Sequence, residues 1–199
     1  MKRFFVNVFI ISIFLGVFGI QSLFSEIPSS LESIPIFPGC TIINEEKAPA
    51  EEGLLFGIVR EYEVSASIED VVIFYEKNLE IKERFKDLDD QNALKVGQII
   101  KPTIQVYFYD DSQFIDGEFG EGGSSERAWI KKALQNRKKD KEGAWIENAN
   151  TQWYFRDTKD TLVELQIIIE DKSINEELNK YQLKTGLTIR VIRYKYDFS

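Results

Sequence analysis

Residues 54–79, LLFGIVREYEVSASIEDVVIFYEKNL, carry the pattern that decides the fold. From Leu54 to Val64 apolar side chains alternate with other residues, a period of two that predicts a half-buried strand, broken only at Arg60. After Ser67 the apolar spacing becomes that of a helix, and Ser67 with Asp70 forms a capping box that fixes its start. The stripe expected to face the core consists of Ile68, Val71, Val72, Tyr75 and Leu79.

The beginning of the chain has the form of an export signal. Lys2 and Arg3 precede an apolar run over residues 4–20, as in segments that enter a bilayer with their basic tip held in the cytoplasm. The run is at the border between a cleaved signal peptide and a spanning helix. We expect residues 1–25 to be a signal peptide cut after Ser25, or a signal anchor that tethers the protein to the inner membrane through residues 4–20. Either way, the domain is expected to be periplasmic or at the cell surface.

Between the leader and the domain lies a proline-bearing stretch. Residues 26–39 contain Pro28, Pro35 and Pro38, each of which fixes φ and removes a backbone donor. We expect an extended linker here. The rest of the chain, residues 40–199, is expected to form a single domain that opens with a strand over 41–44, paired as a hairpin with the strand over 54–64.

Further strands are expected over residues 103–109, 151–156, 162–170 and 187–198. A second helix is expected after Ser124, and a third is expected to begin at Ser173, capped with Glu176, and to end at Gly186. The order β-β-α-β-α-β-β-α-β with short links predicts an α+β fold, a mostly antiparallel sheet with about three helices packed on one face.

Composition excludes several kinds of chemistry. The chain has no histidine, which removes Ser-His-Asp and Cys-His catalysis and the common zinc sites. Its single cysteine, Cys40, can form no intrachain disulfide and is expected to be a small, partly buried side chain at the start of a strand. The net charge of −8 repels phosphate backbones, so we expect no nucleic-acid partner.

Three acidic or glycine-rich features remain as candidate sites. The acidic residues of the loop after residue 109 resemble a calcium loop in composition but not in EF-hand spacing; they are Asp110, Asp111, Asp116, Glu118 and Glu121. The loop's glycines, at 117, 120, 122 and 123, lack the Gly-Lys-Ser/Thr of a phosphate loop. Asp110 or Asp116 with Glu164 or Glu170 could form a glycosidase-type carboxylate pair. A solvated loop is the simpler reading, and we assign no catalytic, cofactor or metal site.

Two further groups of residues could form a binding surface. A basic run could touch anionic lipid or an acidic partner, or could be a solvated helix face; it comprises Lys131, Lys132, Arg137, Lys138, Lys139 and Lys141. Aromatic residues in the expected strands pack in the core unless they are exposed; they are Trp145, Trp153, Tyr154, Phe155, Tyr194, Tyr196 and Phe198.

One stretch resembles a known group of proteins. It is similar to a pattern in exported bacterial proteins and lipoproteins that have no assigned activity. The similar residues are Pro38-Gly39, the strand that ends at Tyr62 to Val64, Ser67-Ile68-Glu69-Asp70-Val71-Val72, and Phe74-Tyr75 followed by Leu79. The similarity covers residues 36–79, and the chain lacks the cysteine that follows the leader in the lipoproteins. The resemblance implies export and a fold, but no chemistry.

These observations together predict an exported cell-envelope protein with a non-enzymatic domain that binds an unknown envelope protein or surface component. An exported hydrolase that uses paired carboxylates is the alternative. A deep pocket with convergent acids would favour the hydrolase, and an exposed sheet face with accessible aromatics would favour the binding domain.

Overall fold

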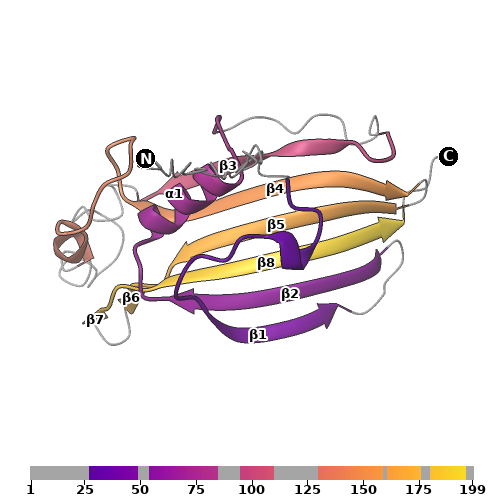
Figure 1. Ribbon diagram of the computed structural model, residues 1–199. Helices are drawn as coiled ribbons and strands as arrows, with labels where there is room; N and C mark the ends of the chain where they lie inside the picture. Colours follow the sequence, from indigo (N-terminus) through magenta and orange to yellow (C-terminus); the bar gives the residue numbers. More distant parts are fainter. Residues whose placement is uncertain are drawn as a thin grey trace, which may run out of the picture.

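A six-stranded antiparallel sheet dominates the computed structural model, which describes residues 27–48, 54–84, 95–109, 130–158, 161–175 and 180–195 (Figure 1). The strands are β1 (Thr41–Ala48), β2 (Leu54–Val64), β3 (Ile99–Phe108), β4 (Ile146–Thr158), β5 (Thr161–Asp171) and β8 (Thr185–Lys195). Their order in space is β1-β2-β8-β5-β4-β3, and every neighbouring pair is antiparallel. The expected strands are therefore confirmed, and β8 lies in the middle of the sheet.

One face of the sheet carries the hydrophobic core. On β5 the residues from Val163 to Ile169 alternate between fully buried and half-buried, because side chains on a strand point to opposite faces. Their cross-strand partners, including Trp153 on β4 and Ile189 on β8, are buried on the same side. We call this side the covered face and the opposite side the open face.

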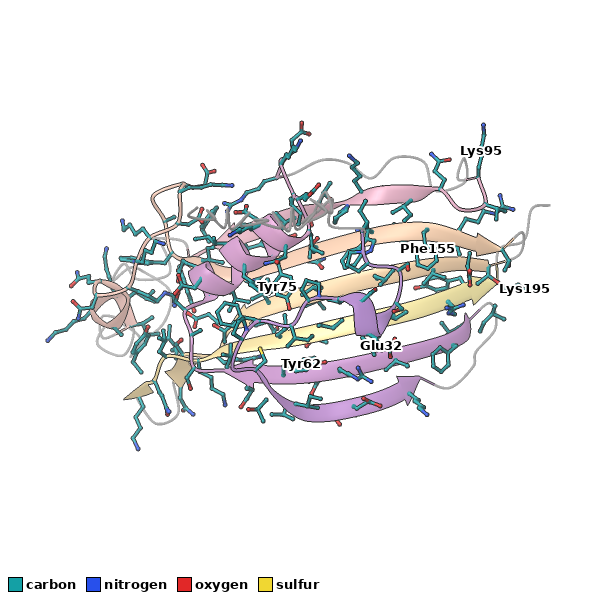
Figure 2. All side chains as sticks on the ribbon, in the orientation of Figure 1. Glu32, Tyr62, Tyr75, Lys95, Phe155 and Lys195 are labelled. Atoms are coloured by element: carbon teal, nitrogen blue, oxygen red, sulfur yellow. The ribbon has the colours of Figure 1, made fainter. Side chains whose placement is uncertain are left out.

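Helix α1 (Ile68–Asn78) packs on the covered face, as expected. The Ser67 Oγ accepts a hydrogen bond from the backbone N–H of Asp70, which satisfies one of the free donors at the helix start. The predicted stripe is confirmed, since Ile68, Val71, Val72 and Tyr75 have no exposed surface and Leu79 is only 3% exposed. Tyr75 of α1 and Tyr62 of β2 both lie in this layer between helix and sheet (Figure 2).

The stretch expected as a linker packs on the sheet beside α1. A short 3-10 helix, η1 (Leu31–Ser33), lies across the covered face (Figure 1), and Leu31 and Ile34 are buried in the main core. The Trp153 indole N–H donates a 2.7 Å hydrogen bond to the Pro28 carbonyl oxygen, so the one polar atom of this buried ring is satisfied. Residues 27–34 thus cover the part of the core that α1 leaves uncovered.

The expected helix at Ser173 is wrong. The chain instead forms a small ribbon of β6 (Ile174–Asn175) and β7 (Lys180–Tyr181), followed directly by β8. Ser173 Oγ donates to the Lys184 carbonyl oxygen and accepts from the Lys184 N–H, so it fastens a hairpin where a helix cap was expected. Gly186 lies within β8, where an added Cβ would come within 3.1 Å of the Lys172 side chain.

The fold class expected from the sequence is also wrong. The chain is mostly antiparallel β-sheet, and it is not an α+β arrangement with three helices on one sheet face. Within the described ranges α1 is the one α-helix that packs on the sheet, beside the 3-10 turn η1. The expected second helix begins in residues that lie outside the described ranges; its described part, residues 130–134, is helical and forms a separate small cluster with Trp145.

The leader, residues 1–25, lies outside the described residues, so export stays a prediction. In the part of the chain that the structure describes, no helix is both long enough and apolar enough to cross a bilayer.

Candidate binding surface

The open face has no described helix or strand packed against it. All six strands lie within the sheet, α1 and η1 both lie on the covered face, and β6 and β7 form a ribbon at the sheet's end (Figure 1). A sheet that is buried on one side alternates apolar and polar residues, and the polar set faces away from the core. The open face is therefore a regular, polar surface that no described helix or strand covers.

Amide side chains concentrate on one half of this face. Cross-strand register places Gln105 of β3 beside Asn150 of β4, and Gln152 of β4 between Thr103 and Gln166. Neighbouring strands lie about 4.8 Å apart, so these side chains are in contact range of one another. We call Gln105, Asn148, Asn150, Gln152 and Gln166 the amide patch.

The amide patch has hydrogen-bonding capacity that the protein does not use. Gln105 Oε1 accepts from the Tyr107 hydroxyl at 3.1 Å. The side chains of Asn150, Gln152 and Gln166 form no hydrogen bond in the described structure, and Asn150 Oδ1 is covered and without a partner. Each amide offers two donors and an acceptor, so the patch can bind a ligand that is both donor and acceptor.

Arg190 lies at the inner end of the amide patch. It is on the central strand β8, directly between Gln166 on β5 and Val59 on β2. Its Nε is covered and has no partner, and no described carboxylate forms an ion pair with its guanidinium. A guanidinium has five donors in a planar fork, so one whose Nε is left without a partner is suited to a carboxylate or another planar anion.

The opposite end of the open face is apolar. Tyr154 and Leu162 are buried against Ile100 and Tyr194, and the Tyr194 hydroxyl donates a 2.8 Å hydrogen bond to Glu164 Oε2. Burial and this carboxylate, in that order, raise the pKa of Tyr194, so the hydroxyl keeps its proton. Tyr107, at 48% exposure, is the single large exposed hydrophobic residue whose register places it on the described open face.

The sequence did not indicate a buried ion cluster beneath α1. Glu69 has no exposed surface, and its Oε1 accepts hydrogen bonds from Arg137 Nη2 at 2.8 Å and Nε at 3.1 Å. Arg137 also donates to Asp171 through Nη1 and to the Ile146 carbonyl oxygen at 2.7 Å. Burial lowers the pKa of Arg137, but Asp171 and Glu69 outweigh burial and hold that pKa above its ordinary value. The guanidinium therefore joins α1 to β4 and the end of β5.

A second arginine forms a similar junction nearby. Arg84 Nε lies 2.8 Å from Glu76 Oε1, and Arg84 Nη1 lies 2.7 Å from Asp140 Oδ2. Lys141 reaches the same Glu76 oxygen at 3.0 Å. Each of the two arginines is therefore bound to two carboxylates. This arrangement fixes chain segments and leaves none of the four acids available as a general acid or base.

The basic run does not form one free surface. Arg137 is buried in the ion cluster, and Lys141 is paired with Glu76. Lys139 lies over the Trp145 ring, with its Nζ 4.7 Å from the ring centroid. Lys132 and Lys138 are exposed, and Lys131 is half-buried.

Every carboxylate pair considered for catalysis includes Asp110 or Asp116, which lie outside the described residues, so the structure does not test these pairs. Glu164 and Glu170 are six residues apart on β5, about 20 Å at roughly 3.3 Å per residue, and each has a partner of its own, Tyr194 and Lys172. The remaining acids and glycines of that proposal, residues 110–123, lie outside the described residues.

The aromatic residues and the cysteine mostly serve packing. Trp145, Trp153, Tyr154 and Phe155 are buried, whereas Tyr196 and Phe198 lie outside the described residues. Cys40 is partly buried just before β1, as expected, and burial raises the pKa of its thiol, which disfavours the reactive thiolate.

The residues that carry the resemblance in residues 36–79 occupy structural positions. Gly39 adopts a positive φ of 85° before β1, Ser67 caps α1, and Leu79 is buried. These three residues define how a strand leads into a helix, and none of the three lies on the open face. Comparison of the chain with protein families, with curated proteins and with solved structures found no match.

Proposed function

We propose that the chain is an exported envelope protein whose domain binds a partner or surface component through the open face and catalyses no reaction. The basic tip and apolar run of residues 1–20 support export. The observation that carries the binding function is the amide patch with Arg190, where unused donors and acceptors of five side chains share one side of a rigid sheet.

A rigid sheet suits this role for a physical reason. Every strand of the six-stranded sheet but the two at its edges is hydrogen-bonded on both sides, so the backbone positions that carry the open-face side chains are fixed relative to one another without a ligand. A preorganised surface loses less conformational entropy on binding than a mobile loop does. On the covered face, the buried clusters around Arg137 and Arg84 fix helix α1 and residues 137–145.

Export is tested with a fusion of residues 1–26 to a reporter that is active only outside the cytoplasm. We expect reporter activity, and activity should be lost when Lys2 and Arg3 are both replaced by Glu, because the basic tip orients insertion. A reporter that stays inactive with the native leader would contradict export. Mass spectrometry of the native protein separates a cleaved leader from an anchor.

Binding is tested by capture from an envelope fraction with the domain from residue 27 onward. A variant with Gln152→Glu and Gln166→Glu places two acids in the amide patch, and we expect it to lose whatever the native domain captures. The matched control makes the same chemical change away from the sheet, Gln135→Glu with Gln182→Glu, and should retain capture. Equal capture by both variants would show that the open face is not the binding surface, and breakdown of a captured component would favour the hydrolase.

A further inference from the structure

Arg190 is an unusual residue for the middle of a sheet in an acidic protein. Its neighbours across the strands are Gln166 and Val59, neither of which carries a charge. Two acids lie diagonally, Glu61 on β2 and Glu164 on β5, yet neither forms an ion pair with it in the described structure. Elsewhere in the sheet, by contrast, Arg60 pairs with Glu45 and Arg193 pairs with Asp157. Arg190 is thus a cation held in a fixed place and left without a counter-ion.

The side chains around Arg190 specify more than an anion. Thr103, Gln152 and Gln166 run in one line from β3 to Arg190, about 14 Å across three strand spacings. Amides and hydroxyls both donate and accept hydrogen bonds. A ligand that lies along this line meets alternating donors and acceptors before it reaches the guanidinium, which fits a chain of hydroxyl groups that ends in, or carries, a carboxylate.

The open face lacks what a protein partner needs. Protein interfaces are anchored by a central apolar or aromatic cluster that is exposed in the free protein. Among the described residues of defined register on this face, Tyr107 at the edge strand β3 is the single large hydrophobic residue that is exposed. Val59, Ile168 and Ile192 are half-buried, and the apolar group around Tyr154 is already packed. A polar, hydroxyl-rich ligand therefore fits the surface better than a polypeptide does.

Charge on the same face limits how anionic the ligand can be. Glu61, Glu63, Glu164 and Glu170 all point to the open face by register. Glu63 and Glu170 are paired with Lys184 and Lys172, so Glu61 and Glu164 are the acids of this set that repel a polyanion, whereas the field at Arg190 attracts one negative group placed on it. The surface is complementary to an isolated carboxylate within a neutral chain.

From these features we propose that the open face binds an oligosaccharide of neutral sugars with one carboxylate-bearing sugar, whose carboxylate is held by Arg190 and whose hydroxyls are held by the amide patch. The proposal rests on the proposed binding function and names its ligand class. Neutral sugars alone bind more weakly because the guanidinium then stays unpaired.

The probes are short oligosaccharides with one uronic acid each, built on several neutral backbones, and each is compared with its carboxyl-reduced form. Binding to the domain from residue 27 onward is measured by calorimetric titration. We expect at least one uronate-bearing oligosaccharide to bind, and its carboxyl-reduced form to bind tenfold more weakly or worse, as the loss of a charge-assisted hydrogen bond implies.

The variants assign this difference to one residue. Arg190→Gln should weaken binding of the acidic oligosaccharide about tenfold or more. It should leave binding of the carboxyl-reduced form unaffected, because carboxyl reduction has already removed the contact with Arg190. Arg193→Gln is the matched control on the same strand, three residues away and on the covered side by register, and should bind within about twofold of the native domain. Native-like circular dichroism of both variants excludes a folding defect.

Two outcomes would overturn the proposal. One is that no uronate-bearing oligosaccharide binds. The other is that Arg190→Gln binds them as tightly as the native domain. An acidic peptide that binds with the same dependence on Arg190, when no sugar binds, would overturn the ligand class and leave the binding function standing. The proposed binding function is tested separately, in the envelope experiment. It would be contradicted if the open-face variant and the control variant captured equally.

Discussion

Arg137 shows how one side chain can hold three parts of a protein together. Its guanidinium contacts Glu69 on α1, Asp171 on β5 and the backbone of Ile146 at the start of β4. The Tyr109 hydroxyl adds a 3.1 Å hydrogen bond to Asp171, and burial, followed by the charge of Asp171, raises the pKa of Tyr109. Both acids contact the same guanidinium, so loss of the arginine removes both contacts whereas loss of one acid leaves the other contact in place. The stability of the cluster therefore depends on the arginine more than on either acid.

That asymmetry gives a graded prediction. Arg137→Met leaves two carboxylates buried without a cation and should lower the free energy of unfolding by about 3–5 kcal/mol. Glu69→Gln keeps the Arg137–Asp171 pair and should cost less, about 1–3 kcal/mol. Unfolding curves in guanidinium chloride measure both changes in the free energy of unfolding, with Lys138→Met at an exposed neighbouring position as the control. If Glu69→Gln proved more damaging than Arg137→Met, the acids and not the arginine would hold the cluster.

Asp140 makes stability depend on pH. Burial alone raises the pKa of Asp140, but hydrogen bonds from Arg84 and from the Glu142 backbone outweigh burial and hold the pKa below its ordinary value. A carboxyl whose pKa is depressed in the folded state stabilises the fold above its unfolded pKa, about 4, and loses that contribution as pH falls through the folded value.

We therefore expect Asp140→Asn to be less stable than the native domain from pH 7 to pH 5. The difference should shrink as pH falls below about 4, where the carboxyl of the unfolded chain takes up a proton, and should vanish once pH is below the lowered pKa of the folded state. Urea unfolding at a series of pH values measures it. A difference that stayed constant down to pH 2 would mean that the Asp140 charge contributes nothing to stability.

Individual residues also mark the limit of what could be predicted from the sequence. The apolar stripe of α1 and the cap at Ser67 were predictable because they depend on neighbours within four positions. Arg137 was placed in a solvated basic run because it is surrounded by lysines in the sequence, while its partners are 68 and 34 positions away. Arg190 has apolar neighbours in the chain, and only the pairing of β8 with β5 places it beside Gln166.

At the level of elements, α1 is the part whose contribution is most directly measured. Leu79, at the C-terminal end of α1, is 3% exposed and belongs to the main core. Leu79→Ala should cost about 2–5 kcal/mol through lost burial and a cavity. Ser67→Ala should cost about 1 kcal/mol through the lost cap.

Ile73→Ala provides the control for the helix. Ile73 lies on the same helix but is 41% exposed, so its replacement should change the free energy of unfolding by no more than about 0.5 kcal/mol. Chemical denaturation compares the three variants. An unchanged midpoint for Leu79→Ala would mean that the stripe does not pack on the sheet.

The elements that were predicted wrongly share a cause. At Ser173 a capping pattern is present in the sequence, but the Ser173 hydroxyl bonds to Lys184, eleven residues away, and the segment becomes part of a hairpin. Local patterns compete with pairing to distant residues, and here the pairing of β6 with β7 takes the place of the helix. The β4–β5 hairpin was predicted correctly because its strands are adjacent in the sequence as well as in space.

Across the whole molecule, stability depends on β8. It pairs along its length with β2 on one side and β5 on the other, and no other described strand joins those two halves of the sheet. A chain that ends at residue 184 should therefore show no cooperative thermal unfolding by circular dichroism. Addition of a synthetic peptide of residues 185–195 should restore it, and a sharp transition without the peptide would contradict this role of β8.

The position of β8 also sets the order in which the protein can be built. Strands that are neighbours in a finished sheet are often made one after another, yet here the strand that completes the centre is the last described strand to leave the ribosome. Before β8 is synthesised, β1 and β2 cannot be joined to β3, β4 and β5 in one sheet. The growing chain therefore cannot form its complete hydrophobic core. For a chain exported as proposed, late pairing of β8 would keep the polypeptide unfolded until a translocation channel that accepts only unfolded chains has taken it up.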